Sequence, residues 1–111
     1  MNDLPLSKDK IMTVAVRLES GCLGPEGEDH IEEFCRFAKK ELEYVDAAFV
    51  AWDIVPRRDK SQPEIQYKLA DKRLTRDMAA KYLGIFAKQI NEFEADLHET
   101  LAQLIEDYSG R

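Results

Sequence analysis

The chain has 111 residues, a formal net charge of −6 and a hydrophobic content of 44%. These values are those of a single globular domain with one core, and they exclude a disordered or fibrous chain. The longest apolar run near the N-terminus is Val14 to Val16 and there are only two cysteines, so we expect a cytoplasmic protein with no signal peptide, membrane span or disulfide framework.

The charges are unevenly distributed along the chain. Residues 57–76 include seven basic and three acidic residues, whereas residues 89–110 include six acidic residues and no lysine or arginine. The overall acidity argues against nucleic acid as a partner. The basic segment is a candidate contact for an acidic protein. The simpler interpretation, which we favour, is a solvated hairpin with ordinary surface charge.

The N-terminal residues predict an arm followed by a strand. Residues 1–10, MNDLPLSKDK, are polar and contain a proline, so we expect a flexible arm there. A single α+β domain then covers residues 11–111. From Ile11 to Glu19 apolar and polar residues alternate with a period of two, which predicts a half-buried strand.

A glycine-rich loop and a helix come next. Residues 20–28, SGCLGPEGE, hold three glycines and a proline and are too irregular for a helix or a strand. Because loops between a strand and a helix usually have about two to six residues, this one is a candidate functional loop. A helix is predicted to begin near Asp29, with a buried stripe of Ile31, Phe34, Cys35, Ala38, Leu42 and Val45.

Two further strands are predicted in the middle of the chain. Residues 47–55 are apolar on both faces, and Pro56 ends this second strand. Residues 57–63 are typical of a turn, and residues 65–70 alternate again as a third strand. The second and third strands are therefore expected to form a hairpin.

Residues 75–108 predict one long C-terminal helix that begins at Thr75 as its N-cap. Its apolar stripe comprises Ala79, Leu83, Phe86, Ile90, Phe93, Leu97, Leu101, Leu104 and Tyr108. At 1.5 Å per residue the helix would be about 50 Å long. The alternative is a break at Gly84, after which the second half would fold back onto the domain's own sheet.

The predicted element order is β-α-β-β-α, an α+β fold with a three-stranded sheet and two helices on one face. The position of the strands in the sheet stays open. Burial on both faces favours the second strand, residues 47–55, as the central one. The other arrangement has the third strand, residues 65–70, in the centre and the first strand as an open edge.

A 50 Å helix would extend beyond strands of about 30 Å, which predicts a partner. The overhanging part would still be apolar, so we expect a homodimer through the long helix. The predicted interaction residues are Phe93, Leu97, Leu101, Leu104 and Ile105 on the helix and Arg57 and Arg58 in the basic segment.

Cys22, His30 and Cys35 are the candidate residues for chemistry near the glycine-rich loop. Cys22 precedes a helix N-terminus, where a thiol can become nucleophilic with His30 as its base. Nearby carboxylates oppose this by disfavouring the thiolate. The spacing matches no closed zinc site, so no metal or cofactor is expected, and Cys35 is expected in the core.

Asp53 interrupts the apolar second strand. A carboxylate in such a place can act as a general acid or base. The simpler interpretation is a cross-strand pair with Arg17 or Lys68 on the exposed face of the sheet.

These observations favour a non-catalytic, dimeric protein-interaction module. Its sheet face or its basic segment would contact another macromolecule. The alternative is a small enzyme, or a ligand-binding or metal-binding protein, with its site in the 20–30 loop at Cys22 and His30. A pocket at that loop with the two side chains within hydrogen-bonding distance would favour the alternative.

Overall fold

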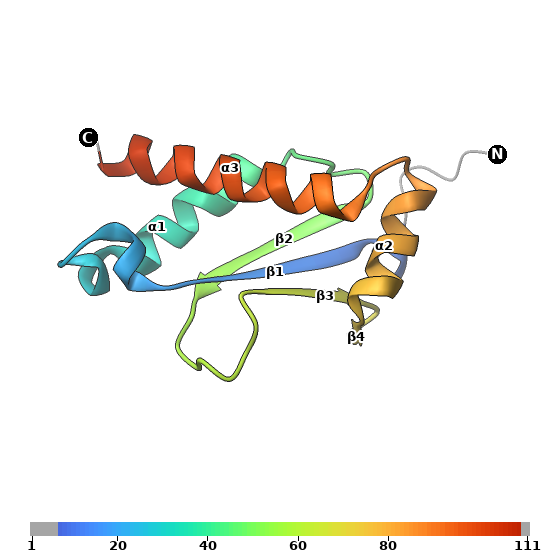
Figure 1. The fold of residues 1–111 in the computed structure, drawn as a ribbon, viewed down its shortest axis with the longest axis horizontal. Coiled ribbons are helices and arrows are strands. Elements are labelled where there is room, and N and C mark those ends of the chain that lie inside the picture. Colours follow the sequence, from blue (N-terminus) through green and yellow to red (C-terminus); the bar gives the residue numbers. More distant parts are fainter. Residues whose placement is uncertain (1–6, 110–111) are drawn as a thin grey trace.

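The computed structural model describes residues 7–109, which form a four-stranded sheet and three α-helices (Figure 1). In chain order the elements are the 3-10 helix η1 (Lys8–Lys10), strand β1 (Met12–Leu18), the 3-10 helix η2 (Ser20–Leu23), helix α1 (Gly27–Leu42), strands β2 (Val50–Pro56), β3 (Ile65–Leu69) and β4 (Lys72–Leu74), and helices α2 (Arg76–Ile85) and α3 (Ile90–Ser109). The predicted α+β class is confirmed. Part of the predicted N-terminal arm, residues 1–6, lies outside the described residues.

The sheet has the strand order β2-β1-β3-β4. β1 runs parallel to β2 and antiparallel to β3, and β3 pairs antiparallel with β4. The predicted hairpin of the second and third strands is wrong, because β1 lies between them. The crossover through α1 places β2 beside β1, and the chain then passes the end of β1 to reach its other side. The prediction of the second strand as the central one is wrong, because β2 is an edge strand. In the other arrangement the inner position of the third strand is confirmed, but β1, expected at an open edge, is also an inner strand.

β4 is the strand that the sequence analysis missed. It has three residues and follows a tight turn at Ala70 and Asp71, which both have positive φ angles of 51° and 66°. Two consecutive residues with positive φ are the signature of a two-residue hairpin loop. Three residues are too few to show an alternating pattern.

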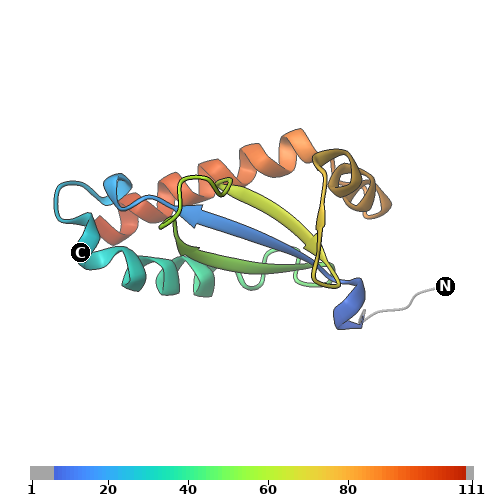
Figure 2. The ribbon, with the colours of Figure 1, turned by 90° about the horizontal axis from the view of Figure 1, so that it is seen from below.

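The two longer helices lie on one face of the sheet, as predicted. Seen from below, the strands lie in front of α1 and α3 (Figure 2). Alternate strand residues point toward these helices and form the core with Ile31, Phe34, Ala38 and Leu42 of α1. The strand residues in this core are Met12, Val14, Val16, Val50, Trp52, Ile54 and Tyr67.

The predicted single helix at residues 75–108 is wrong, because the chain turns between α2 and α3. Thr75 is the N-cap, as expected, and its side chain accepts a 3.1 Å hydrogen bond from the Met78 N–H. α2 ends before Ala87, which has a φ of 62°, and the Lys88 N–H donates to the Leu83 carbonyl at 3.0 Å. This hydrogen bond is the one that closes a Schellman motif, and here the left-handed residue after the helix is Ala87 rather than a glycine. Gly84 itself lies within α2.

Because of this turn, α3 runs back across the sheet, and its apolar stripe packs in the core of the domain. Phe93, Leu97, Leu101 and Leu104 are 3–7% exposed within the single chain, and Ile105 is half-buried. The overhang that motivated a homodimer is therefore absent. These predicted interaction residues instead cover the strands and α1.

α2 packs across the end of the sheet and is held there by Tyr82. Its hydroxyl lies 2.7 Å from the carbonyls of Lys10 and Phe49 and accepts from the Met12 N–H at 3.1 Å. The Phe86 ring stacks on Phe49 with a centroid distance of 4.3 Å. This anchoring directs the chain back toward α1.

Candidate functional site

A cavity of about 660 Å³ lies where the glycine-rich loop, α1 and the end of α3 meet. We call it the Tyr108 groove. It is lined by Leu23, Pro25, Glu26, His30, Glu33, Phe37, Tyr108 and Ser109. His30, Glu33 and Phe37 follow one another at steps of three and four residues, which places them on one side of α1.

Two aromatic rings, those of Phe37 and Tyr108, line one side of the Tyr108 groove, and Phe34 is buried behind them. The Tyr108 ring lies 5.3 Å from the Phe34 ring in an edge-on arrangement and 5.7 Å from the Phe37 ring, measured between centroids. The Tyr108 hydroxyl donates a hydrogen bond to the Glu33 carboxylate. This bond fixes a negative charge beside the aromatic rings.

The Tyr108 groove is negatively charged. Glu26 and Glu33 contribute carboxylates, and its lining includes no lysine or arginine. On a neighbouring flank of α1, Arg58 pairs with Glu28 at 3.3 Å and Glu32 at 2.8 Å. Arg58 therefore neutralises carboxylates outside the groove lining, and the groove keeps its acidic character.

Cys22 and His30 do not form the predicted nucleophile and base. His30 lines the Tyr108 groove, but Cys22 lies in η2 outside its lining. The hydrogen bonds of residues 7–109 include none between the two side chains. Burial raises the pKa of the Cys22 thiol and the Glu19 carboxylate adds to this, which disfavours the reactive thiolate.

The potential metal ligands of this region are also dispersed. Among residues 7–109 no three His, Cys, Asp or Glu side chains come together as a possible metal site. Cys35 is 3% exposed and packs in the core, as expected. Its burial raises the pKa of the thiol to about 11.

Asp53 lies on the face of the sheet that is opposite the helices. Its register partner on β1 is Ala15. Arg17, a predicted partner of Asp53, instead donates to the Pro63 carbonyl at 2.9 Å and to Gln66 Oε1 at 2.8 Å. The ion pairs found within the described part of the chain include neither predicted pair of Asp53.

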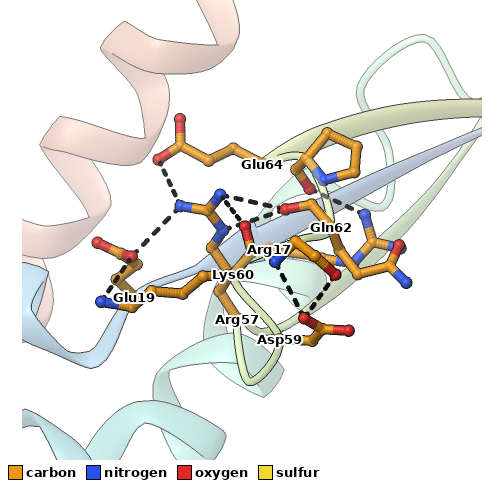
Figure 3. Close-up of polar contacts among 9 residues, drawn as sticks. Arg17, Glu19, Arg57, Asp59, Lys60, Gln62 and Glu64 are labelled. Carbon is orange, nitrogen blue, oxygen red and sulfur yellow. Dashed lines mark hydrogen bonds and ion pairs between the residues drawn. The ribbon is translucent and has the colours of Figure 1, made fainter.

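The first part of the basic segment, around Arg57, makes several polar contacts within the chain (Figure 3). The Arg57 side chain is 19% exposed and ion-pairs with Glu19 at 3.3 Å. Its guanidinium also donates to the carbonyls of Lys60 at 3.2 Å and Gln62 at 3.1 Å. Arg57 therefore holds the loop between β2 and β3 in place, and the Arg58 side chain, 56% exposed, pairs with carboxylates of α1.

Glu33, Phe37 and Tyr108 were not predicted as site residues from the sequence. The spacing of His30, Glu33 and Phe37 on one helix was a visible signal. Tyr108 gave none, because its approach to α1 depends on the turn at Ala87 and on the direction that α3 then takes.

Comparison with protein-family models gives no match, and neither the curated proteins nor the solved structures contain a significant match to this chain. Within residues 7–109, none of the helices combines the length and apolar character that crossing a membrane requires.

Proposed function

We propose that this protein is a non-catalytic binding module whose Tyr108 groove accepts a basic segment of a partner protein. The observation that carries the proposal is the pairing of Glu33 with Tyr108 beside the Phe37 ring, which also lines the groove. A guanidinium or ammonium group can bind the carboxylate and lie against an aromatic face at the same time.

The exposure of the groove favours a protein partner over a small molecule. Glu26, His30 and Glu33 are all exposed, so the groove is open to solvent along its acidic side. Sites for small molecules bury roughly 70–90% of the ligand surface. An open acidic groove suits a segment that remains attached to a larger surface and contributes only some of its side chains.

Binding rather than catalysis is supported by the roles of the neighbouring side chains. Glu33 already accepts a hydrogen bond from Tyr108, and Cys22 lies outside the groove lining. A homodimer through α3 is not part of this proposal, because the apolar residues that suggested it pack within the chain.

The proposal is tested by fluorescence anisotropy with two fluorescein-labelled decapeptides. One alternates arginine with leucine, and the other has serine in place of leucine. The two carry the same charge, so tighter binding of the leucine peptide reports the aromatic wall rather than charge alone. We expect Glu33→Gln to weaken binding of the leucine peptide about tenfold, since hydrogen bonds to charged groups contribute about 1.5–3 kcal/mol.

The matched control is Glu99→Gln. Glu99 is an exposed residue of α3 outside the groove lining, and its replacement removes the same charge. Equal loss of affinity in both variants would mean that the peptide responds only to net charge, and the proposal would then be wrong.

A further inference from the structure

A second cavity, of about 280 Å³, lies farther along the same two helices. We call it the Trp52 cavity. It is lined by Leu42, Val45, Asp46, Trp52, Ala87, Lys88, Gln89, Glu92, Phe93, Asp96, Leu97 and Thr100. Like the Tyr108 groove, it lies between α3 and the α1 region, here the end of α1 at Leu42 and the residues that follow it.

The Trp52 cavity repeats the chemistry of the Tyr108 groove. The Trp52 and Phe93 rings stack with centroids 5.7 Å apart and planes within 9° of parallel. Carboxylates of Glu92 and Asp96, both exposed, also line the cavity. Aromatic rings beside carboxylates again favour a cationic group.

The one lysine of the cavity lining is already paired. Lys88 Nζ lies 3.5 Å from Asp46 Oδ1, so this cation neutralises Asp46. The ion pairs found among residues 7–109 include neither Glu92 nor Asp96. The Trp52 cavity therefore keeps two carboxylates for an incoming cation.

A polar stripe with three carboxylates runs along α3 from the Trp52 cavity toward the Tyr108 groove. Glu92, Asp96, Thr100, Gln103 and Asp107 follow one another at steps of three or four residues, which places them on one side of the helix. Three of them line the Trp52 cavity, at Glu92, Asp96 and Thr100. On α1, the row of His30, Glu33 and Phe37 that lines the Tyr108 groove continues at the next helical step to Lys40 and Glu41, which carry opposite charges.

The distance between the cavities sets the length of a ligand that reaches both. Asp96 and Tyr108 are separated by twelve residues of α3, which corresponds to about 18 Å along the helix axis. A partner helix that lies along this stripe would need basic residues about twelve positions apart. Val45, which lines the Trp52 cavity, is 42% exposed and offers further apolar contact area.

We propose that one basic helix of a partner protein occupies the Tyr108 groove and the Trp52 cavity together. This inference rests on the proposed function, since it extends the ligand of the Tyr108 groove. Charge complementarity carries it: carboxylates line both cavities, and Asp107 adds one more on the side of α3 that runs between them. Engaging two sites with one segment increases affinity because the second contact is intramolecular.

The test uses two synthetic 20-residue alanine-rich helices that carry two arginine pairs. In one peptide the pairs are twelve positions apart, and in the other they are five positions apart. Neither contains tryptophan, so Trp52, the only tryptophan of the protein, reports occupation of its own cavity. We expect the twelve-position peptide to bind on the order of tenfold more tightly and to change the Trp52 emission.

Two variants separate this inference from the proposed function. Glu92→Gln combined with Asp96→Asn should remove the advantage of the longer spacing, and Glu99→Gln combined with Glu106→Gln is the control of equal charge change on exposed α3 positions outside both linings. Circular dichroism checks that both double variants remain folded.

Each outcome decides one of the two proposals. The two-cavity inference is overturned if the Trp52 emission stays constant and the double variant at Glu92 and Asp96 binds both peptides like the wild type. If Glu33→Gln still weakens binding in that case, the Tyr108 groove alone remains as the binding site. If Glu33→Gln also has no effect, the proposed function fails as well.

Discussion

The Tyr67 hydroxyl on β3 donates a 2.5 Å hydrogen bond to Glu94 on α3. Arg76 at the start of α2 ion-pairs with the same carboxylate at 3.0 Å. One half-buried side chain therefore connects the sheet with both C-terminal helices. Burial alone would raise the pKa of Glu94, but the hydrogen bonds from Tyr67 and Arg76 outweigh it and lower that pKa.

Tyr67→Phe should destabilise the fold by about 1–3 kcal/mol, because it removes the donor to Glu94 Oε2, while Arg76 keeps its hydrogen bond to Oε1. Tyr67 is only 4% exposed, so water cannot easily replace the hydroxyl. Urea unfolding followed by circular dichroism measures the difference. A midpoint equal to that of the wild type would show that Glu94 does not depend on this bond.

The lowered pKa of Glu94 also predicts how stability depends on pH. A carboxyl whose pKa is lower in the folded state stabilises the protein above its unfolded value, near the ordinary 4.5, and this contribution is lost as the pH falls through the folded value. The difference in urea midpoint between wild type and Glu94→Gln should therefore shrink between pH 6 and pH 3. Arg76 stays charged throughout, so it does not produce this change. A difference that stays constant across the range would contradict the assignment.

Leu97→Ala distinguishes a core role of α3 from a role in a dimer interface. Leu97 is 3% exposed within one chain, and its truncation should cost about 2–5 kcal/mol. Because the lost contacts are intramolecular, the loss should be the same at every protein concentration. Thermal unfolding over a hundredfold range of concentration is the measurement. A loss that grows on dilution would restore the interpretation of α3 as an interface.

Arg57→Lys should loosen the loop between β2 and β3, since a lysine cannot replace the several directed hydrogen bonds of a guanidinium. We expect a cost of about 1–2 kcal/mol and faster amide exchange at residues 59–64. The matched control is Arg58→Lys, because Arg58 is 56% exposed and exposed pairs contribute about 0–1 kcal/mol. Equal exchange rates in the two variants would show that Arg57 does not organise the loop.

Local patterns predicted much of the fold. Alternation located β1 and β3, helical spacing located α1, and Thr75 was recognised as an N-cap. The order of the strands was not predictable in this way, because pairing of β1 with β3 joins segments about fifty residues apart. Nothing in the alternation of a strand specifies its neighbours.

The turn between α2 and α3 shows why the long helix was mispredicted. Apolar residues at Leu83, Phe86, Ile90 and Phe93 keep steps of three and four residues straight through the break, so periodicity cannot detect it. The nearest glycine, Gly84, is helical, and the left-handed residue is Ala87. The position of the turn is better explained by the packing of Phe86 on Phe49 than by any local sequence signal.

The same turn explains how far the candidate site was predictable. The 20–30 loop and His30 were identified as one border of a possible site, and both line the Tyr108 groove. Tyr108 reaches Glu33 only because α3 runs back along α1. Tyr108 is seventy-five positions from Glu33 in the chain, so the spacing of residues in the sequence could not show that the two meet in one site.

The binding position of a basic peptide tests the central proposal most directly. In a series of two-dimensional ¹H–¹⁵N NMR spectra recorded during titration with the arginine–leucine decapeptide, we expect shifts of the amides of residues 23–37 and of the last turn of α3 up to Ser109. The amides on the open face of the sheet, at residues 13–17, 51–55 and 66–73, should stay in place. Shifts confined to that open face would contradict the account.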